Sequence, residues 1–250
     1  MQKIHSIFFL IFLSYTGFAQ KDVSVFESGK EGYAIFRIPS IVQLPNKKIL
    51  AFAEGRINGG ADFGNIKIVL KTSDDKGKTW SALKIIASYE HWQVGNAAPV
   101  VDLLDPAYPN GKIYLFYNTG NVSEHDLRLG KGIREVWFIS STDEGATWSS
   151  PRNITQEVHF PNGAMDGRKY SSEKDWRTYA NTPGHASQCM EGKYKGRIYI
   201  PANHSEGSVK PNFRDYYSHG YYTDDHGKSF KISSSLTIPG SNEATAAFIS

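Results

Sequence analysis

Short runs of apolar and β-branched residues, separated by turn residues, recur along the whole chain. Residues 41–44 and 49–53 form two such runs on either side of Pro45 and Asn46, which predicts a hairpin of two strands. Further runs of this kind lie at 66–71, 99–104, 112–117, 135–140 and 197–201. Because no window of twelve residues keeps a helical period without Gly or Pro, we predict an all-β fold.

One turn motif occurs three times, and each copy directly follows a strand-like run. Its pattern is Ser or Thr, any residue, Asp, any residue, Gly, any residue, Thr or Ser, and an aromatic residue; the copies occupy 73–80, 141–148 and 223–230. Inside such a turn, Asp can accept hydrogen bonds from backbone amides, and Gly can adopt a positive φ. The aromatic ring can pack the turn onto its sheet. A strand unit that repeats and cannot bury its own faces predicts a β-propeller, with inserted loops at 118–132 and 157–184.

The aspartates of these turns do not by themselves predict a metal site. A calcium loop of the EF-hand type needs a bidentate Glu at its twelfth position and flanking helices, and the sequence has neither. Cys189 is the only cysteine, so an internal disulfide is excluded. Its neighbours do not form a recognisable setting for a nucleophilic thiol, and we expect it to be buried or inert.

The charge composition gives no sign of a nucleic-acid partner or of an acidic tail. The 250 residues include 28 basic and 25 acidic side chains, for a formal net charge of +3. This balance favours neither a nucleic-acid partner nor an acidic tail. Aromatic residues make up 13% of the chain and glycine occurs 23 times, which is typical of many short strands and turns.

The N-terminus has the pattern of a signal peptide. Lys3 precedes a mostly apolar stretch from Ile4 to Leu13, and Gly17 and Ala19 are small residues at the positions that a signal peptidase reads. The apolar stretch is too short for the alternative, a membrane anchor that spans the bilayer. We therefore predict a signal peptide at 1–19, one domain at 20–250, and export from the cytoplasm.

Polar side chains gather at the ends of the first predicted strands. Arg37 lies before Pro39, Arg56 directly follows a strand-like run, and Asp62 lies in the glycine-rich loop 58–64. Charged side chains at strand ends indicate a polar site built on a β scaffold.

These residues carry a resemblance to a known family. The sequence Phe36-Arg37-Ile38-Pro39, followed by the repeated turns (Asp-box turns from here on), resembles the exo-α-sialidases or neuraminidases from Val25 onward. The resemblance implies a six-bladed β-propeller. It also implies that Arg37 binds the carboxylate of sialic acid, for which a planar guanidinium is well suited. Arg56 would lie near the O4 position of the sugar, although an ion pair with Glu54 on the same strand face is an alternative.

The resemblance also implies two catalytic carboxyl groups. Asp62 would protonate the departing glycosidic oxygen and later deprotonate water; the alternative is an Asp that stabilises a turn. Glu243 would take the proton of a tyrosine nucleophile, a neutral group that the substrate carboxylate does not repel. The alternative for Glu243 is a Glu at the start of a strand.

Two further segments match the family pattern at sugar-binding positions. Asn96, in Gly95-Asn96-Ala97, matches a position that contacts the sugar. Gln188 and His185 lie in a segment that resembles one lining the pocket, and both are equally compatible with ordinary polar loop residues.

The family pattern continues past Ser250. Two more carboxylate-binding arginines and the tyrosine nucleophile should follow Glu243, and neither residue type occurs in 244–250. We expect the chain to be an N-terminal part of a longer protein, with about four of the six blades, and to be inactive alone. Four tyrosines at 216, 217, 221 and 222 are better explained by packing in strands than as nucleophiles.

The sequence therefore leads to one main hypothesis and two alternatives. The main one is an exported, monomeric, retaining exo-α-sialidase that needs no cofactor or metal. It would release terminal sialic acid from glycoproteins, glycolipids or oligosaccharides, with no nucleic-acid partner and no membrane segment after signal cleavage. The first alternative is a non-catalytic propeller that binds sialic acid. The second is a propeller glycosidase with two carboxylates, which the Arg37 motif disfavours because a neutral sugar gives the arginine no anion to bind.

Overall fold

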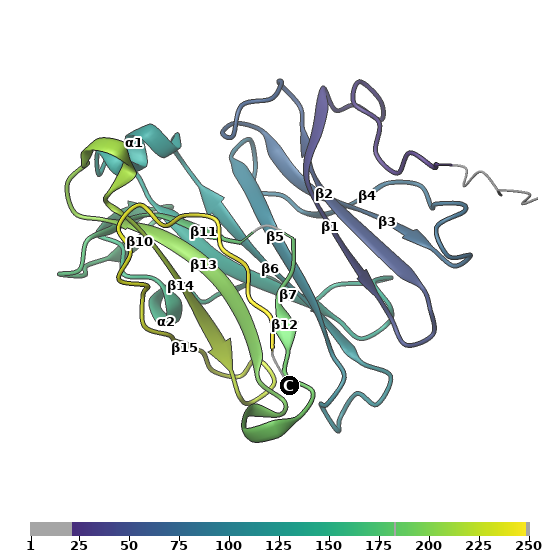
Figure 1. The fold of residues 1–250 in the computed structure, drawn as a ribbon. Coiled ribbons are helices and arrows are strands. Elements are labelled where there is room, and N and C mark those ends of the chain that lie inside the picture. The colour runs from purple at the N-terminus through teal and green to yellow at the C-terminus, as the bar shows by residue number, and fades with distance from the viewer. Residues whose placement is uncertain (1–21, 183, 249–250) are drawn as a thin grey trace, which may run out of the picture.

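The computed structural model describes residues 22–182 and 184–248, and these residues form mainly β-strands (Figure 1). The first unit of four antiparallel strands consists of β1 (Ile35–Gln43), β2 (Ile49–Arg56), β3 (Ile66–Ser73) and β4 (Lys84–Ala87). The second consists of β5 (Gln93–Asp102), β6 (Lys112–Gly120), β7 (Arg134–Ser141) and β8 (Arg152–Asn153). The third consists of β11 (Trp176–Asn181), β13 (Ile198–Glu206), β14 (Tyr216–Thr223) and β15 (Lys231–Ile232). The all-β prediction is confirmed, and β1 and β2 form the predicted hairpin, with Gln43 opposite Ile49.

The remaining elements are short. A hairpin of β9 (Gly163–Met165) and β10 (Arg168–Tyr170) stands apart, and β12 (Ser187–Gln188) pairs with β13. The α-helices are α1 (Glu124–Arg128) and α2 (Thr155–Val158), and 3-10 turns occupy Gly192–Tyr194 and Pro211–Phe213. None of the helices in 22–182 and 184–248 has the length and apolar character needed to cross a bilayer. The predicted signal peptide at 1–19 lies outside the described residues.

One sequence-based expectation about the strand units needs correction. The first two units join into an eight-stranded sheet, because β3 and β5 pair in parallel at Ile66 and Gln93, and the third unit with β12 forms a five-stranded sheet. The number of blades stays a prediction. The predicted insertion at 157–184 contains β11, which is a strand of the third unit and pairs with β13. The other predicted insertion, 118–132, does contain a connection between strands, and it forms α1.

Each Asp-box turn links the last two strands of a unit and has the predicted bonding. Asp75 accepts a hydrogen bond from the backbone N–H of Thr79 at 2.9 Å and another from its hydroxyl at 2.6 Å. Asp143 accepts the same pair of bonds from Thr147. Hydrogen bonds from these threonine side chains are the largest cause that lowers the pKa of each aspartate to about 2.

The glycine of the second turn packs against the first unit. Gly145 has a φ of +84°, and a Cβ at this position would lie 2.7 Å from Cδ2 of Leu50, which is fully buried. Gly77, in the first turn, has a nearly identical φ of +83°, but a Cβ there would meet nothing closer than Trp80 at 3.7 Å. The two glycines therefore share a backbone conformation and differ in the space around them.

This difference predicts unequal effects of the same substitution. Gly77→Ala is expected to lower the free energy of unfolding by about 1–2 kcal/mol, because a side chain is unfavourable at positive φ. Gly145→Ala is expected to cost a further ~1–3 kcal/mol from overpacking against Leu50. Urea unfolding of both variants measures the difference, and equal losses would contradict close packing of this turn on the first unit.

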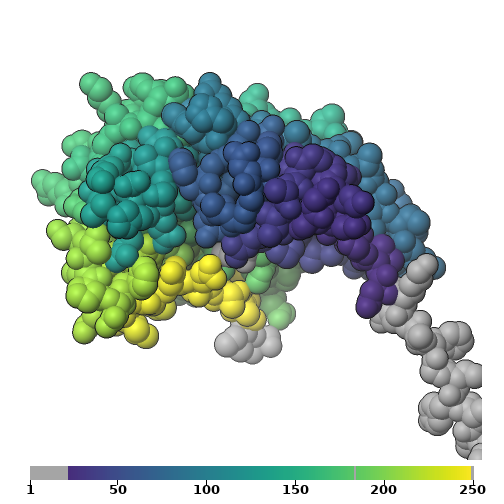
Figure 2. Space-filling model, turned by 90° about the horizontal axis from the view of Figure 1, so that it is seen from above, coloured from purple at the N-terminus to yellow at the C-terminus, as the bar shows by residue number. Residues whose placement is uncertain are grey.

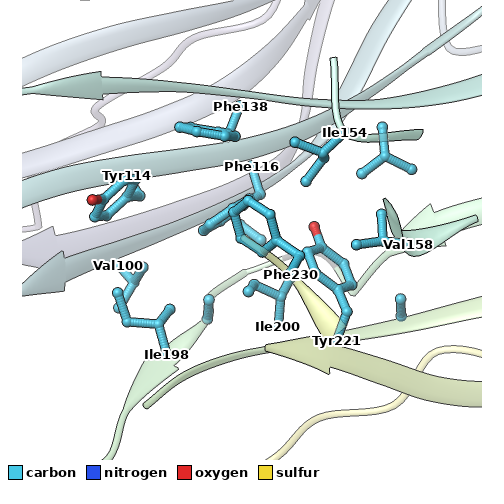
Figure 3. Close-up of a cluster of buried hydrophobic side chains, with 14 of the residues drawn as sticks. Val100, Tyr114, Phe116, Phe138, Ile154, Val158, Ile198, Ile200, Tyr221 and Phe230 are labelled. Carbon is cyan, nitrogen blue, oxygen red and sulfur yellow. The ribbon is translucent and has the colours of Figure 1, made fainter. Parts of the chain in front are cut away.

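Two hydrophobic cores hold the units side by side, because the second unit buries both of its faces. Along β6, Tyr114 and Phe116 belong to the core shared with the third unit, and Leu115 and Tyr117 belong to the core shared with the first. Figure 3 shows the former core, where Phe116 and Phe138 face Phe230 and Tyr221 across the interface. The ring centroids of Phe116 and Phe230 are 5.8 Å apart. Packing between the units therefore fixes the relative positions of the strand ends.

Candidate active site

A cavity forms where strands from all three units and the C-terminal segment meet. Five of the six sequence-predicted site residues line it: Arg37, Arg56, Asp62, Asn96 and Glu243. These residues come from β1, β2, the loop after β2, β5 and the segment after β15. Seen from above, the N-terminal strands in purple, the teal segment with α1 and the yellow C-terminal segment share one face of the molecule (Figure 2). The structure thus brings together residues that lie up to 206 positions apart, between Arg37 and Glu243.

A bulge in β1 places Arg37 at the cavity. The pairing of β1 with β2 shifts register between Arg37 and Ser40, and Ile38 has a positive φ of 52°. Pro39 has no N–H to donate to the sheet, which makes a regular ladder impossible at this point. Bulges of this kind change the direction of side chains. The Arg-Ile-Pro sequence therefore accounts for the local backbone at the site.

Asp62 lies between two guanidinium groups. Its Oδ1 accepts from Nη1 of Arg56 at 2.6 Å and from Nη1 of Arg37 at 3.2 Å. The Asp62 side chain is 68% exposed, and that of Arg37 is 46% exposed. Both groups are therefore accessible to a ligand, and the second oxygen of Asp62 has no part in these contacts.

Arg56 and Glu54 form a buried pair that the sequence offered as an alternative to a site role. Oε2 of Glu54 accepts from Nε of Arg56 at 3.0 Å and from Nη2 at 2.6 Å. Glu54 is 1% exposed and Arg56 is 2% exposed, yet both line the cavity. Because Arg56 also contacts Asp62, the ion pair and the cavity position exist together. The pair is positioned to hold Asp62 in place.

Asn96 is fixed by its backbone as much as by its side chain. It has a φ of 56°, next to a register shift in β5, and its N–H donates to Oε1 of Glu54 at 2.9 Å. Its Nδ2 donates to the carbonyl of Asn181 at 3.3 Å. A Cβ on the preceding Gly95 would lie 2.3 Å from Glu54, so only glycine permits this approach. Glu54 thus connects Arg56 to Asn96 across two units.

Glu243 reaches the cavity from a segment without regular secondary structure. The segment is attached to β14 because the backbone N–H of Ser218 donates to the hydroxyl of Ser241 at 2.9 Å. The hydroxyl of Ser218 in turn donates to the carbonyl of Asn242. Within the described residues, no strand begins at Glu243.

The structure does not bring Gln188 to the cavity. Gln188 lies on β12 opposite Ile198, whereas the cavity residue Asn203 lies five residues further along β13, or about 16 Å away at the usual strand rise. Its amide is engaged elsewhere, since it donates to Asp102 at 2.5 Å and accepts from the N–H of Leu103 at 2.7 Å. His185, in the same segment, is exposed and lies 3.5 Å from Thr245.

Several residues that line the cavity were not predicted from the sequence. They are Glu54, Gln93, Glu124, Arg134, Tyr179 and Asn203, together with smaller contributors. Arg134 directly precedes the predicted strand-like run 135–140, and Glu124 lies in the predicted inserted loop 118–132. The sequence alone gave no reason to connect either of them with Arg37.

Tyr179 is the tyrosine among the described residues that line the cavity, and it is not a suitable nucleophile. Its side chain is fully buried, and burial raises its pKa well above the ordinary value. Its hydroxyl contacts Nε2 of His219 at 3.3 Å, inside the third unit. Tyr216 and Tyr221 are also buried, in agreement with a packing role.

One group of potential metal ligands occurs among the described residues, outside the lining of the cavity. Ligand atoms of Asp102, Asp105 and His226 lie within 4.8 Å of one another. Nδ1 of His226 is 2.7 Å from Oδ2 of Asp102, and the other oxygen of Asp102 contacts Gln188. The contact between Asp102 and His226 links β5 to the third Asp-box turn.

Comparison with known proteins agrees with this fold. A model of a BNR repeat-like domain matches residues 47–247. The match covers most of the chain, and together with the strand units and the polar cavity it defines a BNR repeat-like domain.

The matching relatives indicate a narrower family within such domains. An exo-alpha-sialidase of Aspergillus fumigatus is 32% identical over 156 residues, which are 54% of this chain and 37% of the fungal protein. Human sialidase-4 is 28% identical over 221 residues, covering 83% of this chain and 41% of that protein. The chain therefore belongs to the exo-α-sialidase family of such domains. It spans less than half the length of these relatives.

Solved structures show the same fold. A Hadza microbial sialidase superimposes with a TM-score of 0.64 at 20% identity, covering 83% of this chain and 39% of that chain. A leech intramolecular trans-sialidase superimposes with a TM-score of 0.62 at 15% identity, covering 89% and 47% respectively.

Proposed function

We propose that the complete protein is an exported exo-α-sialidase that releases terminal sialic acid from glycoconjugates with retention of configuration. The observation that supports this most directly is the arrangement of Arg37, Asp62 and Arg56 in one accessible cavity. The relatives, named as sialidases, supply the substrate class. The signal peptide at 1–19, the single domain at 20–250 and the monomeric state are part of the proposal.

Arg37 has the properties of a carboxylate receptor. Its side chain is about half exposed, and its ion pair with Asp62 is longer than the ion pair between Arg56 and Asp62. A planar carboxylate can bind a guanidinium through two parallel hydrogen bonds. The substrate carboxylate would thus take the place of Asp62 at Arg37, and Asp62 would keep its contact with Arg56.

Asp62 would then act as the general acid and base. Released from Arg37, its carboxyl group can protonate the glycosidic oxygen and afterwards accept a proton from the attacking water. Arg56, which Glu54 orients, and Asn96 would bind substituents of the sugar ring. Glu243 would accept the proton of a tyrosine nucleophile that lies outside this chain.

The stereochemical outcome tests this proposal. The full-length protein is expected to release α-sialic acid first from an aryl α-sialoside, followed by slow conversion to the β form, as recorded by proton NMR. Release of the β form first would contradict a covalent glycosyl-tyrosine intermediate. Binding without release would instead identify a non-catalytic sialic-acid-binding domain. Hydrolysis of neutral aryl glycosides alone would identify a glycosidase with two carboxylates.

A further inference from the structure

Arg134, the first residue of β7, is a buried cation without an anionic partner among the described residues. It is 6% exposed and lines the same cavity as Arg37 and Arg56. Its Nη2 donates to Oε1 of Gln93 at 3.0 Å, and its Nη1 donates to the carbonyl of Tyr179 at 3.4 Å. Both acceptors are neutral, and Nε has no acceptor among the described residues.

This arrangement is unfavourable for the unliganded protein. Removing an ion from water costs several kcal/mol unless charges and hydrogen bonds compensate. Arg56, which is buried to a similar degree, meets that cost with contacts to Glu54 and Asp62. Burial lowers the pKa of Arg134 from its ordinary value, yet an arginine remains charged in proteins.

The surrounding residues keep the guanidinium in this position. Gly120 gives it room, since a Cβ there would lie 3.3 Å from Nε of Arg134. Gln93 is itself buried at the start of β5, so its amide oxygen is a fixed acceptor. A buried charge that destabilises the protein and is still held in one position by its neighbours is expected to contribute to function.

The chemistry beside Arg134 favours an uncharged ligand group. The carboxylate of Glu124, which the hydroxyl of Tyr216 holds, lines the same cavity without pairing with Arg134. The negative charges of Glu124, Glu54 and Asp62 all act on the guanidinium. They would repel a second carboxylate at this position. A hydroxyl or an acyl amide can accept from Arg134 and donate to Glu124 at the same time.

We infer that Arg134 binds substrate by donating to an uncharged oxygen of a sialic acid side chain, either the glycerol chain or the N-acyl group. The inference rests on the proposed function, because it assigns part of the same cavity. Among the described residues, Nε of Arg134 lacks a hydrogen-bond acceptor, and this oxygen would supply an acceptor to the buried guanidinium. Arg134 therefore determines which side-chain substituents the site accepts.

The test compares the full-length protein with Arg134→Met, which keeps the apolar stem and removes the charge. KM for an intact sialoside is expected to rise about 10-fold to 100-fold, the range for loss of hydrogen bonds from a charged donor. The melting temperature is expected to stay the same or rise, because an uncompensated buried charge is lost. A lower melting temperature with an unchanged KM would overturn the inference, since that pattern indicates a structural role.

Modified substrates identify the atom that is bound. For a sialoside with a shortened glycerol chain or one with an altered N-acyl group, the effect of Arg134→Met should shrink only where Arg134's acceptor has been removed. Equal losses on all three substrates would contradict the inference and indicate contact with the carboxylate. Arg197→Met is the control, because Arg197 pairs with Asp224 outside the cavity and its loss should leave KM unchanged.

Two further measurements keep the result interpretable. Arg134→Gln replaces Arg134→Met if the latter does not fold, and Arg134→Lys should recover part of the affinity because it restores the charge. The thermal shift caused by free sialic acid reports binding without turnover. A wild-type protein that binds but does not hydrolyse would refute the proposed function, while a smaller shift for the Arg134 variants would still support this inference.

Discussion

Asp62→Asn in the full-length protein is expected to lower kcat/KM for a galactose-linked sialoside by about 10²-fold to 10⁴-fold, the usual contribution of a general acid and base. Asparagine has nearly the same shape and can still accept from Arg37 and Arg56 through its amide oxygen, but it cannot transfer a proton. An aryl sialoside with an acidic leaving group needs little protonation. The loss on this substrate is therefore expected to be clearly smaller.

A stability measurement and a control variant separate this effect from a general disturbance of the site. The Asp62 side chain is 68% exposed, so the loss of its ion pairs should change the free energy of unfolding by no more than about 1 kcal/mol. Asp74→Asn is the matched control, because Asp74 is also exposed and pairs with a single basic residue, Lys48. Near-normal turnover of the galactose-linked substrate by Asp62→Asn would remove Asp62 from its catalytic role.

The part of the site that the sequence predicted is continuous in the chain. Arg37, Arg56 and Asp62 lie on one hairpin and the loop that follows it. Their proximity therefore depends mainly on the pairing of β1 with β2, which the turn at 45–46 already indicates. A motif that short can be recognised without knowledge of the rest of the fold.

The part that the sequence missed depends on contacts between units. Arg134 and Glu124 reach the cavity because the cores on both faces of the second unit place β7 and α1 beside the first and third units. Gln188 was misplaced for a related reason. Its position follows from the register of β12 on β13, and the sequence does not show which end of β13 lies at the cavity.

The strand β11 was missed because its buried side chains are not typical core residues. Trp176, Thr178, Tyr179 and Asn181 are all buried, and the strand lacks the aliphatic alternation seen in 66–71. Its partner strand contributes His204, and histidine is only intermediate in its tendency to be buried, so it gives no clear core signal in a sequence. The ring of Trp176 stacks on His204 with centroids 3.4 Å apart. The third unit therefore has a core that is partly titratable.

Three histidines in that core are expected to make the protein lose stability on mild acidification. His159, His204 and His219 are each at most 5% exposed. Burial is the largest cause that lowers the pKa of His204 to about 2 and that of His219 to about 3, and it lowers the pKa of His159 well below its usual value. Nδ1 of His204 lies 3.0 Å from Nδ1 of His219, so a charge on one opposes a charge on the other. Arg134 and Lys174 add further positive charge nearby.

The direction of the effect follows from which state binds protons. In the unfolded chain a histidine titrates near pH 6.5, whereas in the fold these three remain neutral to much lower pH. Their contribution is therefore complete above pH 6.5 and is lost as the pH falls from 6.5 toward their folded pKa values. Well below pH 6.5, each histidine is expected to reduce the free energy of unfolding by about 1.4 kcal/mol per pH unit. Together the three amount to roughly 4 kcal/mol per unit.

Urea unfolding of the full-length protein between pH 7.5 and pH 5 measures this slope. The aspartates of the Asp-box turns do not interfere, because their stabilisation is lost only below the ordinary Asp pKa of about 3.9.

His159→Phe keeps the aromatic packing on Tyr179, where the ring centroids are 4.5 Å apart, and removes one titrating group. Neither ring nitrogen of His159 has a hydrogen-bond partner in the described part of the chain, so the variant should be at least as stable at pH 7.5. Its slope should fall by about a third, while the exposed control His91→Phe should keep the wild-type slope. An unchanged slope in His159→Phe would show that the buried cluster does not cause the acid sensitivity.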